Sequence, residues 1–324
     1  MISLFNLHGK DIISVLDFDK KLIEEIFSVA YIMEKYAKSI GPSLLKGKIM
    51  ASLFFEPSTR TRLSFEAAMY RLGGNVIGFT SAEASSVAKG ETLSDTIKTV
   101  ENYCDCIVLR HPAEGAAKLA AELSNVPVIN AGSGAQEHPT QALLDIYTIK
   151  RELGKVDGLE IGIVGDLKYG RTVHSLVYAL SLFDVNLSFV SPPSLRLRDE
   201  IEEDLRKRGV KFKYYEDIEK IISTLDVIYV VRIQKERFPD PAEYLRVKGS
   251  YKITSSIIPK AKPKCIILHP LPRIDEISLD VDSHPQAKYF IQTFYGLCIR
   301  MALLSMILAD EEDLKQLFYK SGVV

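Results

Sequence analysis

Hydroxyl and guanidinium side chains gather at residues 58–62, where the sequence reads Ser58-Thr59-Arg60-Thr61-Arg62. An apolar run at 49–55 precedes them, and apolar residues recur at helical spacing from 63 to 72. A helix start has unpaired N–H groups and a positive dipole end, and hydroxyl and guanidinium donors match the oxygens of a phosphate. This pattern predicts a phosphate-type anion site. The alternative is a capped helix with surface arginines, but so many donors directly behind a buried strand favour the anion site.

Polar side chains follow further apolar runs of the sequence. They are Arg110, then His138 with Gln141, then Arg171 with Thr172, then Arg232 with Gln234, and finally His269. A lone arginine is usually a solvated surface charge, and a lone histidine is usually a satisfied polar residue. In open α/β sheets, however, ligands bind beyond the carboxyl ends of the strands. The recurrence therefore predicts that these side chains line one binding region.

The elements that must position these side chains are short apolar runs alternating with helix-period segments. Strands are expected at residues 49–55, 76–80, 106–110, 126–130, 160–165, 186–190, 226–231 and 265–269. Between them, apolar residues recur at i, i+4 and i+7, as in Leu93, Ile97 and Val100. Such alternation is typical of parallel sheets covered on both faces. We expect an α/β protein with two three-layer α/β/α domains, a boundary near residue 140 and a helix over 142–151 linking the halves.

The composition excludes several classes of protein. Lys and Arg total 41 against 42 Asp and Glu, which gives a net charge of −1 and no general attraction for nucleic acid or an anionic membrane. The apolar runs at 301–304 and 306–309 are far shorter than the ~18 residues of a membrane span, and the N-terminus does not resemble a signal peptide. Four scattered cysteines fit neither a disulfide framework nor a zinc site. We expect a cytoplasmic chain without metal.

Nucleotide-binding loops are a weaker interpretation of the sequence. There is no Gly-x4-Gly-Lys-Ser/Thr motif. The turn that contains Gly162 and Gly165 does not complete Gly-x-Gly-x-x-Gly, and no ribose-binding acid follows the next strand. These two glycines are better interpreted as packing positions.

Three segments resemble the aspartate/ornithine carbamoyltransferase family: residues 55–66, His138-Pro139-Thr140-Gln141 and 269–273. The pair Arg232-x-Gln234 and the segment Leu271-Pro272 are similar to the aspartate branch, whereas the ornithine branch typically carries a cysteine where this chain has Pro270. The similarity extends over nearly the whole chain.

The resemblance implies a fold, a reaction and no cofactor. Residues 1–140, completed by a C-terminal helix at 297–324, would bind carbamoyl phosphate, and residues 141–296 would bind aspartate. The family's reaction transfers the carbamoyl group to the α-amine of L-aspartate, giving N-carbamoyl-L-aspartate and phosphate, the committed step of de novo pyrimidine biosynthesis. The amine would attack directly through a tetrahedral intermediate, without a covalent enzyme adduct.

For carbamoyl phosphate, the resemblance implies roles that agree with the anion site predicted above. The phosphate would be held by Ser58, Thr59, Arg60 and Thr61. Arg110 would bridge the phosphate and the carbonyl oxygen, His138 would donate to that oxygen, and Gln141 would order the carbamoyl amide. The backbone carbonyls of Leu271 and Pro272 would face the incoming amine and the carbamoyl nitrogen.

For aspartate, the resemblance implies that Arg171 and Arg232 hold the two carboxylates, because guanidinium forks match carboxylates better than ammonium groups do. Gln234, Thr172 and Lys89 would support them. The segment 85–92 resembles a loop from which Ser85 (or Ser86) and Lys89 reach a neighbouring subunit's site, which implies a homotrimer.

Further roles follow from the same resemblance. Glu56 and Arg237 would form ion pairs around Arg171 when the domains close. The role of Tyr244 stays open, because its loop is about one residue off the common spacing. Residues 114–118 lie where some members contact zinc-bearing regulatory chains, which would give a larger dodecamer with possible allostery; an exposed helix start is the alternative.

Two other functions stay open at this stage. A carbamoyltransferase for a different amine would keep Arg60 and His138 but need other groups at Arg171, Arg232 and Gln234. A non-catalytic scaffold or regulatory member would usually lose part of the phosphate motif, which is intact here.

Overall fold

The computed structural model describes residues 6–39, 41–84, 86–233, 238, 240–247, 249 and 251–321. The chain divides into two compact units, which are described separately below. The first comprises Met1–Leu144 and Thr293–Val324, and the second comprises Asp145–Gln292.

The first unit contains a parallel sheet in the order β2-β1-β3-β4. Its strands are β1 (Ile49–Phe54), β2 (Asn75–Phe79), β3 (Cys106–His111) and β4 (Val128–Ser133). Its helices are α1 (Lys20–Met33), α2 (Thr59–Arg71), α3 (Leu93–Val100), α4 (Ala116–Leu123), α9 (Ile291–Leu308) and α10 (Glu311–Ser321), and α5 (Pro139–Leu153) crosses into the second unit.

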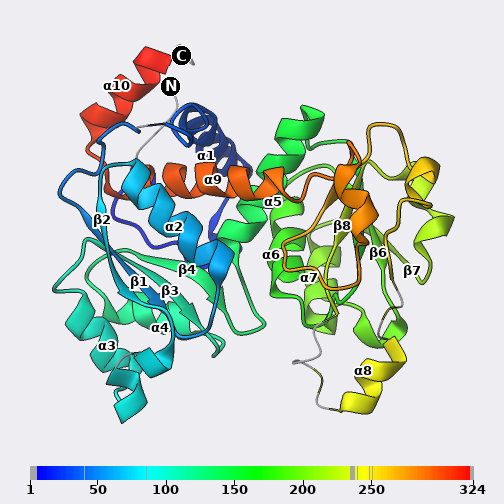
Figure 1. Cartoon of the computed structure of the whole chain (residues 1–324), viewed down its shortest axis with the longest axis horizontal. Helices are drawn as coiled ribbons and strands as arrows, with labels where there is room; N and C mark the ends of the chain where they lie inside the picture. Colours follow the sequence, from blue (N-terminus) through cyan, green and yellow to red (C-terminus); the bar gives the residue numbers. More distant parts are fainter. Residues whose placement is uncertain are drawn as a thin grey trace. The chain divides into compact units, whose positions relative to one another are not determined.

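Helices cover both faces of this first sheet, as Figure 1 shows for α3 and α4 on one side and α1, α2 and α9 on the other. Alternate residues of the strands account for this arrangement. Ala51 and Leu53 of β1 pack in one core cluster with Ile97 of α3 and Ala120 of α4. Ser52 points the other way, where its hydroxyl donates to Glu66 on α2. The sheet is therefore the middle of three layers.

The second unit contains a five-stranded parallel sheet in the order β7-β6-β5-β8-β9. Its strands are β5 (Glu160–Val164), β6 (Asn186–Val190), β7 (Lys211–Tyr215), β8 (Val227–Val230) and β9 (Ile266–Leu268), and its further helices are α6 (Arg171–Leu180), α7 (Asp199–Lys207) and α8 (Pro241–Val247). The expected α/β class with two parallel sheets is confirmed.

Two differences from the expected elements have local causes. Strand β7 was not expected, although its Lys-Phe-Lys-Tyr alternation is typical of an edge strand with one packed face. Phe212 and Tyr214 pack against Phe189 of β6, with ring centroids 5.4 and 5.3 Å apart. The expected C-terminal helix at 297–324 is two helices, because Asp310 followed by three acidic residues is a helix-start signal.

One helix among the described residues, α9, is long and apolar enough to cross a membrane. However, 78% of its apolar window is buried inside the protein, which is typical of a core helix in a globular fold.

Candidate functional site

The carboxyl ends of β1 and β3 form the topological switch point of the first sheet. The chain leaves β1 toward β2 on one side and returns to β3 on the other. The two ends lie side by side, since the Phe55 N–H donates to the Arg110 carbonyl at 2.9 Å. Ligands of open parallel sheets bind in the crevice at such a point, and α2 starts here.

The start of α2 leaves several donors without partners. Ser58 is the N-cap residue, in extended conformation, and its hydroxyl makes no capping hydrogen bond. The backbone N–H groups of Thr59, Arg60 and Thr61 meet no acceptor among the described residues. These groups carry the positive end of the helix dipole, so this turn is an open cradle for an anion.

Arg60 adds an uncompensated positive charge to that cradle. Within the described part of the chain its guanidinium has no hydrogen bond or ion pair, and partial burial lowers its pKa. An arginine nevertheless stays protonated at neutral pH. Arg62, two residues later, is different, because its Nη1 lies 3.0 Å from Glu66 Oε2.

Thr61 and His138 are brought together although they are far apart in the sequence. The Thr61 Oγ1 lies 3.4 Å from the Nε2 of His138, which is 3% exposed. His138 directly precedes α5, and its carbonyl accepts from the N–H of the buried Gln141 at 3.0 Å. The preceding Glu137 accepts from the Ser14 hydroxyl and the Val15 N–H at 2.8 and 2.9 Å, which fixes this turn.

Arg110 ends β3 beside the same turn and has a carboxylate partner. Its Nη2 lies 2.8 Å from Oε1 of Glu56, and its Nη1 donates to the Ala131 carbonyl at 3.3 Å. Both charged side chains are mostly buried. An anion that enters this place must compete with Glu56 for the Arg110 guanidinium.

The second sheet has an equivalent switch point at the ends of β5 and β8. Val231 N–H donates to the Val164 carbonyl at 2.8 Å, which places Arg232 beside the turn after β5. Gly165 in that turn has φ +119°, and a Cβ there would lie 2.1 Å from the Val231 carbonyl oxygen, so only glycine fits. Helix α6 then starts with Arg171 and Thr172, both half-buried like Arg232.

The turn after β9 contains Leu271 and Pro272, whose backbone carbonyls were predicted to face the substrates. Leu271 has φ +53°, and the bond to Pro272 is cis. The Leu271 N–H donates to His269 Nδ1 at 2.7 Å, and His269 Nε2 lies 2.7 Å from Glu276 Oε1. Burial raises the pKa of Glu276, but its hydrogen bond with His269 and those from backbone N–H groups outweigh burial and hold that pKa below its ordinary range. This buried pair anchors the turn.

Other residues predicted for the site lie on loops. Lys89 ends a short 3-10 helix (Ser86–Lys89), is exposed, and forms no ion pair with any described residue. Tyr244 on α8 contacts Phe238, which contacts Tyr169, each pair of ring centroids being 5.7 Å apart. Ser85, Gln234 and Arg237 lie outside the described residues.

Metal ligands and reactive thiols are not evident in the described ranges. No group of three or more His, Cys, Asp or Glu side chains there could hold a metal ion. Burial raises the pKa of Cys104 to about 11 and that of Cys265 to about 12, so both are thiols at neutral pH.

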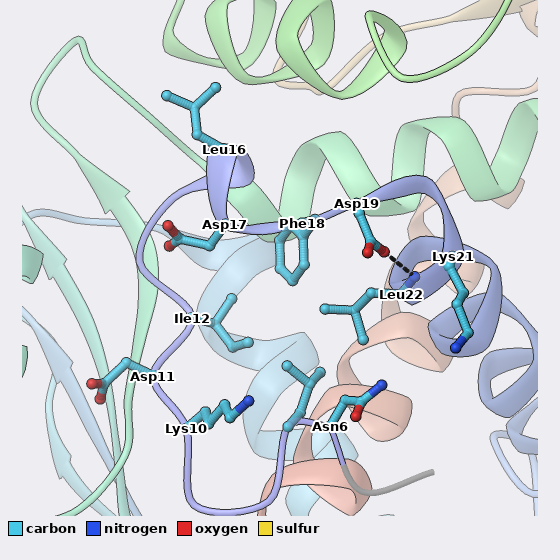
Figure 2. A pocket seen from close by; sticks show the side chains of 11 residues that line it. Asn6, Lys10, Asp11, Ile12, Leu16, Asp17, Phe18, Asp19, Lys21 and Leu22 are labelled. Atoms are coloured by element: carbon cyan, nitrogen blue, oxygen red, sulfur yellow. Dashed lines mark hydrogen bonds between the residues drawn. The ribbon is translucent and has the colours of Figure 1, made fainter. Parts of the chain in front are cut away.

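A hollow of about 480 Å³ lies elsewhere in the first unit, along the N-terminal segment between Asn6 and Leu22. Figure 2 shows charged side chains such as Lys10, Asp11 and Asp17 around it. None of the predicted site residues lines this hollow.

Sequence reasoning passed over Arg300 and Ser64. Arg300 is the one charged residue of α9, a signal that could have singled it out. Ser64 lies only three residues after Thr61, and its hydroxyl oxygen accepts a hydrogen bond from Arg300 Nη1 at 2.7 Å.

Comparisons with known proteins identify the family of this chain. Residues 10–151 match the family model described as the carbamoyl-P binding domain of aspartate/ornithine carbamoyltransferase, and residues 157–307 match the Asp/Orn binding domain. The aspartate carbamoyltransferase catalytic subunit of Methanopyrus kandleri is 58% identical over 301 residues, which are 93% of this chain and 97% of that protein. That of Methanocaldococcus jannaschii is 58% identical over 305 residues, 94% of this chain and 99% of that one.

Solved structures give the same result. The catalytic subunit of M. jannaschii aspartate transcarbamoylase has a TM-score of 0.86 at 57% identity, covering 94% of this chain and 99% of that one. Aspartate transcarbamoylase from Trypanosoma cruzi in complex with carbamoyl phosphate and aspartate has a TM-score of 0.90 at 43% identity, covering 94% and 99%. The chain therefore belongs to the aspartate/ornithine carbamoyltransferase family, and within it to the aspartate carbamoyltransferase catalytic subunits. The resemblance drawn from the sequence motifs is confirmed.

Proposed function

We propose that this chain transfers the carbamoyl group of carbamoyl phosphate to the α-amine of L-aspartate. The products are N-carbamoyl-L-aspartate and phosphate, and the reaction is the committed step of de novo pyrimidine biosynthesis. The observation that carries the proposal is the open anion cradle at the start of α2, where the Arg60 guanidinium has no partner among the described residues and Thr61 lies next to His138. The names of the relatives, and the ligands named for the T. cruzi enzyme, support the same reaction.

Carbamoyl phosphate binds with its phosphate on the first turn of α2. The backbone N–H groups and the hydroxyls of Ser58, Thr59 and Thr61 donate to its oxygens, and Arg60 neutralises charge. Arg110 exchanges its contact with Glu56 for the phosphate and the carbonyl oxygen. A dianion held by charge-assisted hydrogen bonds can compete with a single carboxylate for this guanidinium.

His138 and Arg110 stabilise the charge that develops on the carbonyl oxygen when the amine attacks. Gln141 orders the carbamoyl amide. The attack makes a tetrahedral centre, and donors positioned for its oxyanion contribute roughly 2.7–4 kcal/mol each in comparable sites. Collapse of this centre breaks the C–O bond to phosphate, and the departing phosphate takes up the proton that the amine loses, so the reaction needs no covalent enzyme adduct.

Aspartate binds through Arg171 and Arg232, whose forked donors fit its two carboxylates. Thr172, Gln234 and Lys89 support this contact, and the backbone carbonyls of Leu271 and Pro272 orient the amine. Holding both substrates in attacking geometry can lower the barrier by up to roughly 7–11 kcal/mol in the best oriented systems. Ion pairs of Glu56 and Arg237 accompany closure.

The active enzyme is a cytoplasmic homotrimer in which Ser85 and Lys89 complete a neighbour's site. Lys89 is exposed and has no ion partner within the described ranges, which supports this role. Strand β2 is an edge strand with Ile77 40% exposed, and Leu63 and Tyr70 on α2 are 48% and 59% exposed, which favours a subunit contact there. Zinc-bearing regulatory chains contact residues 114–118, of which Glu114, Gly115 and Lys118 are exposed, and give a dodecamer.

The test is a ureido-product assay with carbamoyl phosphate and either L-aspartate or L-ornithine. We expect turnover with aspartate only. Turnover only with ornithine or another amine would contradict the assignment of the substrate. A protein that binds carbamoyl phosphate in calorimetry but transfers it to no amine would instead be the non-catalytic member of the family.

A further inference from the structure

Arg300 is a buried charge in an otherwise uncharged helix. It lies in α9 and is the only Lys, Arg, Asp or Glu of that helix. Its side chain is 3% exposed. Burying a guanidinium is costly unless partners replace its water shell, so its position in the core requires a structural or functional reason.

The partners of Arg300 include two residues of α2. Its Nη1 donates to the Ser64 Oγ at 2.7 Å, and its guanidinium carbon lies 5.0 Å from the centre of the Phe65 ring. Gly296, one turn earlier in α9, leaves room for this arrangement, since a Cβ there would lie 3.1 Å from Nη1. The charge of α9 is thus directed at the helix that carries the anion cradle.

Ser64 connects Arg300 to the first turn of α2. Its Oγ lies 2.6 Å from the carbonyl oxygen of Arg60 and 3.0 Å from that of Thr61. The Ser64 oxygen accepts the hydrogen bond from Arg300 through a lone pair. The single hydrogen of the Ser64 hydroxyl therefore remains available to donate to these carbonyls. The Arg60 carbonyl and the Thr61 N–H belong to one rigid peptide plane. Fixing that carbonyl therefore fixes an N–H group of the anion cradle.

We propose that Arg300 is a positioning residue for the phosphate-binding turn of α2. The inference rests on the proposed function of that turn. Arg300 acts through Ser64 on the orientation of the Arg60–Thr61 peptide, and its charge adds to the positive potential at the helix start. Hydrogen bonds in series polarise one another, so the relay also strengthens the Thr61 N–H as a donor.

The first test compares Arg300→Met and Arg300→Lys with the wild type. Inorganic phosphate binding is measured by calorimetry, and KM is measured separately for carbamoyl phosphate and aspartate. We expect Arg300→Met to raise the phosphate Kd and the carbamoyl phosphate KM about 10- to 100-fold, the factor of a charge-assisted hydrogen bond, with the aspartate KM unchanged. Arg300→Lys keeps a charge and a donor and recovers most of the affinity. A merely structural role would reduce the folded fraction without changing these constants.

Ser64→Ala and Ser305→Ala form a matched pair that isolates the relay. Both remove a hydroxyl that donates to the carbonyl four residues earlier, since the Ser305 Oγ lies 2.8 Å from the Met301 carbonyl oxygen. We expect Ser64→Ala to weaken phosphate binding and Ser305→Ala to leave it unchanged. The double variant Ser64→Ala/Arg300→Met should bind phosphate like Arg300→Met alone, because both changes break one pathway.

The outcomes separate this inference from the proposed function. If the wild type binds phosphate and both Arg300→Met and Ser64→Ala bind it equally well, the positioning role is overturned and the proposed site stands. If the wild type binds neither phosphate nor carbamoyl phosphate, the proposed site falls and the positioning role falls with it. If Arg300→Met does not fold, Ser64→Ala decides, because Ser64 lies at a half-exposed helix position.

Discussion

The two switch points are built alike and differ in the loop that follows the first strand. In each unit this strand leads to a helix start with an arginine, Arg60 after β1 and Arg171 after β5, and the strand across the switch point supplies a second one, Arg110 or Arg232. The first loop is short and leaves the α2 amides open. The second contains Gly165 and the buried Asp166, whose carboxylate accepts from the Tyr169 N–H at 2.9 Å.

The sheet topology therefore places the arginines at both switch points. The loop after the first strand determines which donors are available to an anion. An open helix start offers backbone donors in a tight ring, which suits the tetrahedral oxygens of phosphate. Separate guanidinium groups suit planar carboxylates. Under the proposed function, the same fold therefore serves two kinds of recognition.

Arg60→Ala should have the largest effect at the first switch point. We expect kcat/KM to fall about 10²- to 10³-fold, because the guanidinium that neutralises charge at the first turn of α2 is lost. Steady-state kinetics measure the fall, and circular dichroism checks the fold. Arg62→Ala is the control, since Arg62 already pairs with Glu66 at 3.0 Å. Equal losses in the two variants would contradict the assignment of Arg60.

Arg232→Ala tests whether the second switch point serves the other substrate. We expect the KM for aspartate to rise about 10- to 100-fold, the range for a lost charge-assisted contact. Phosphate binding, followed by calorimetry, should not change. A variant that loses phosphate affinity but keeps its aspartate KM would reverse the assignment of the two regions.

Tyr229→Phe tests a buried hydrogen bond in the second unit. The Tyr229 hydroxyl donates to Asp145 Oδ2 at 2.7 Å, and both residues are fully buried. Removing the donor takes a hydrogen bond from a buried carboxylate oxygen and should lower the free energy of unfolding by about 1–3 kcal/mol, measured by urea titration. Tyr215→Phe, on the half-buried edge strand β7, should change it by less than about 0.5 kcal/mol. Similar losses would rule out a special role for the Tyr229–Asp145 bond.

Glu137→Gln should give the smallest effect, and its sign depends on pH. Burial raises the pKa of Glu137, outweighing the hydrogen bonds from Val15 and Ser14 that lower it. A carboxyl whose pKa is raised on folding stabilises the fold below its unfolded pKa, about 4.3, and loses that contribution as pH rises through the folded value. The neutral variant should therefore melt at a higher temperature than the wild type at pH 7. The difference should vanish near pH 4, and a constant difference across this range would contradict the shift.

Much of the fold could be predicted from the sequence, because buried parallel strands appear in it as continuous apolar runs. The runs beginning at 49, 106, 160 and 186 correspond to strands with bounds within a residue. Strand β7 was not predicted from the sequence, because its outward positions are Lys211 and Lys213, which interrupt the apolar run at a sheet edge. The boundary at Asp310 was not predicted because the helix at 297–324 came from the family resemblance, while the acidic residues after Asp310 are a local helix-start signal.

For the candidate site, the groups that stand where the chain leaves a strand follow from the sequence alone, since capping chemistry and donor types are local properties of residues 58–62. The Arg62–Glu66 pair is equally local, because Glu66 stands four residues after Arg62 on one helix face, whereas Arg60 has Ser64 at that position and its guanidinium has no partner among the described residues. Partners that are distant in the sequence depend on the fold. Arg300 meets Ser64 across 236 positions of the sequence. Pairings over such separations follow from how helices pack on a sheet, and no local pattern encodes them.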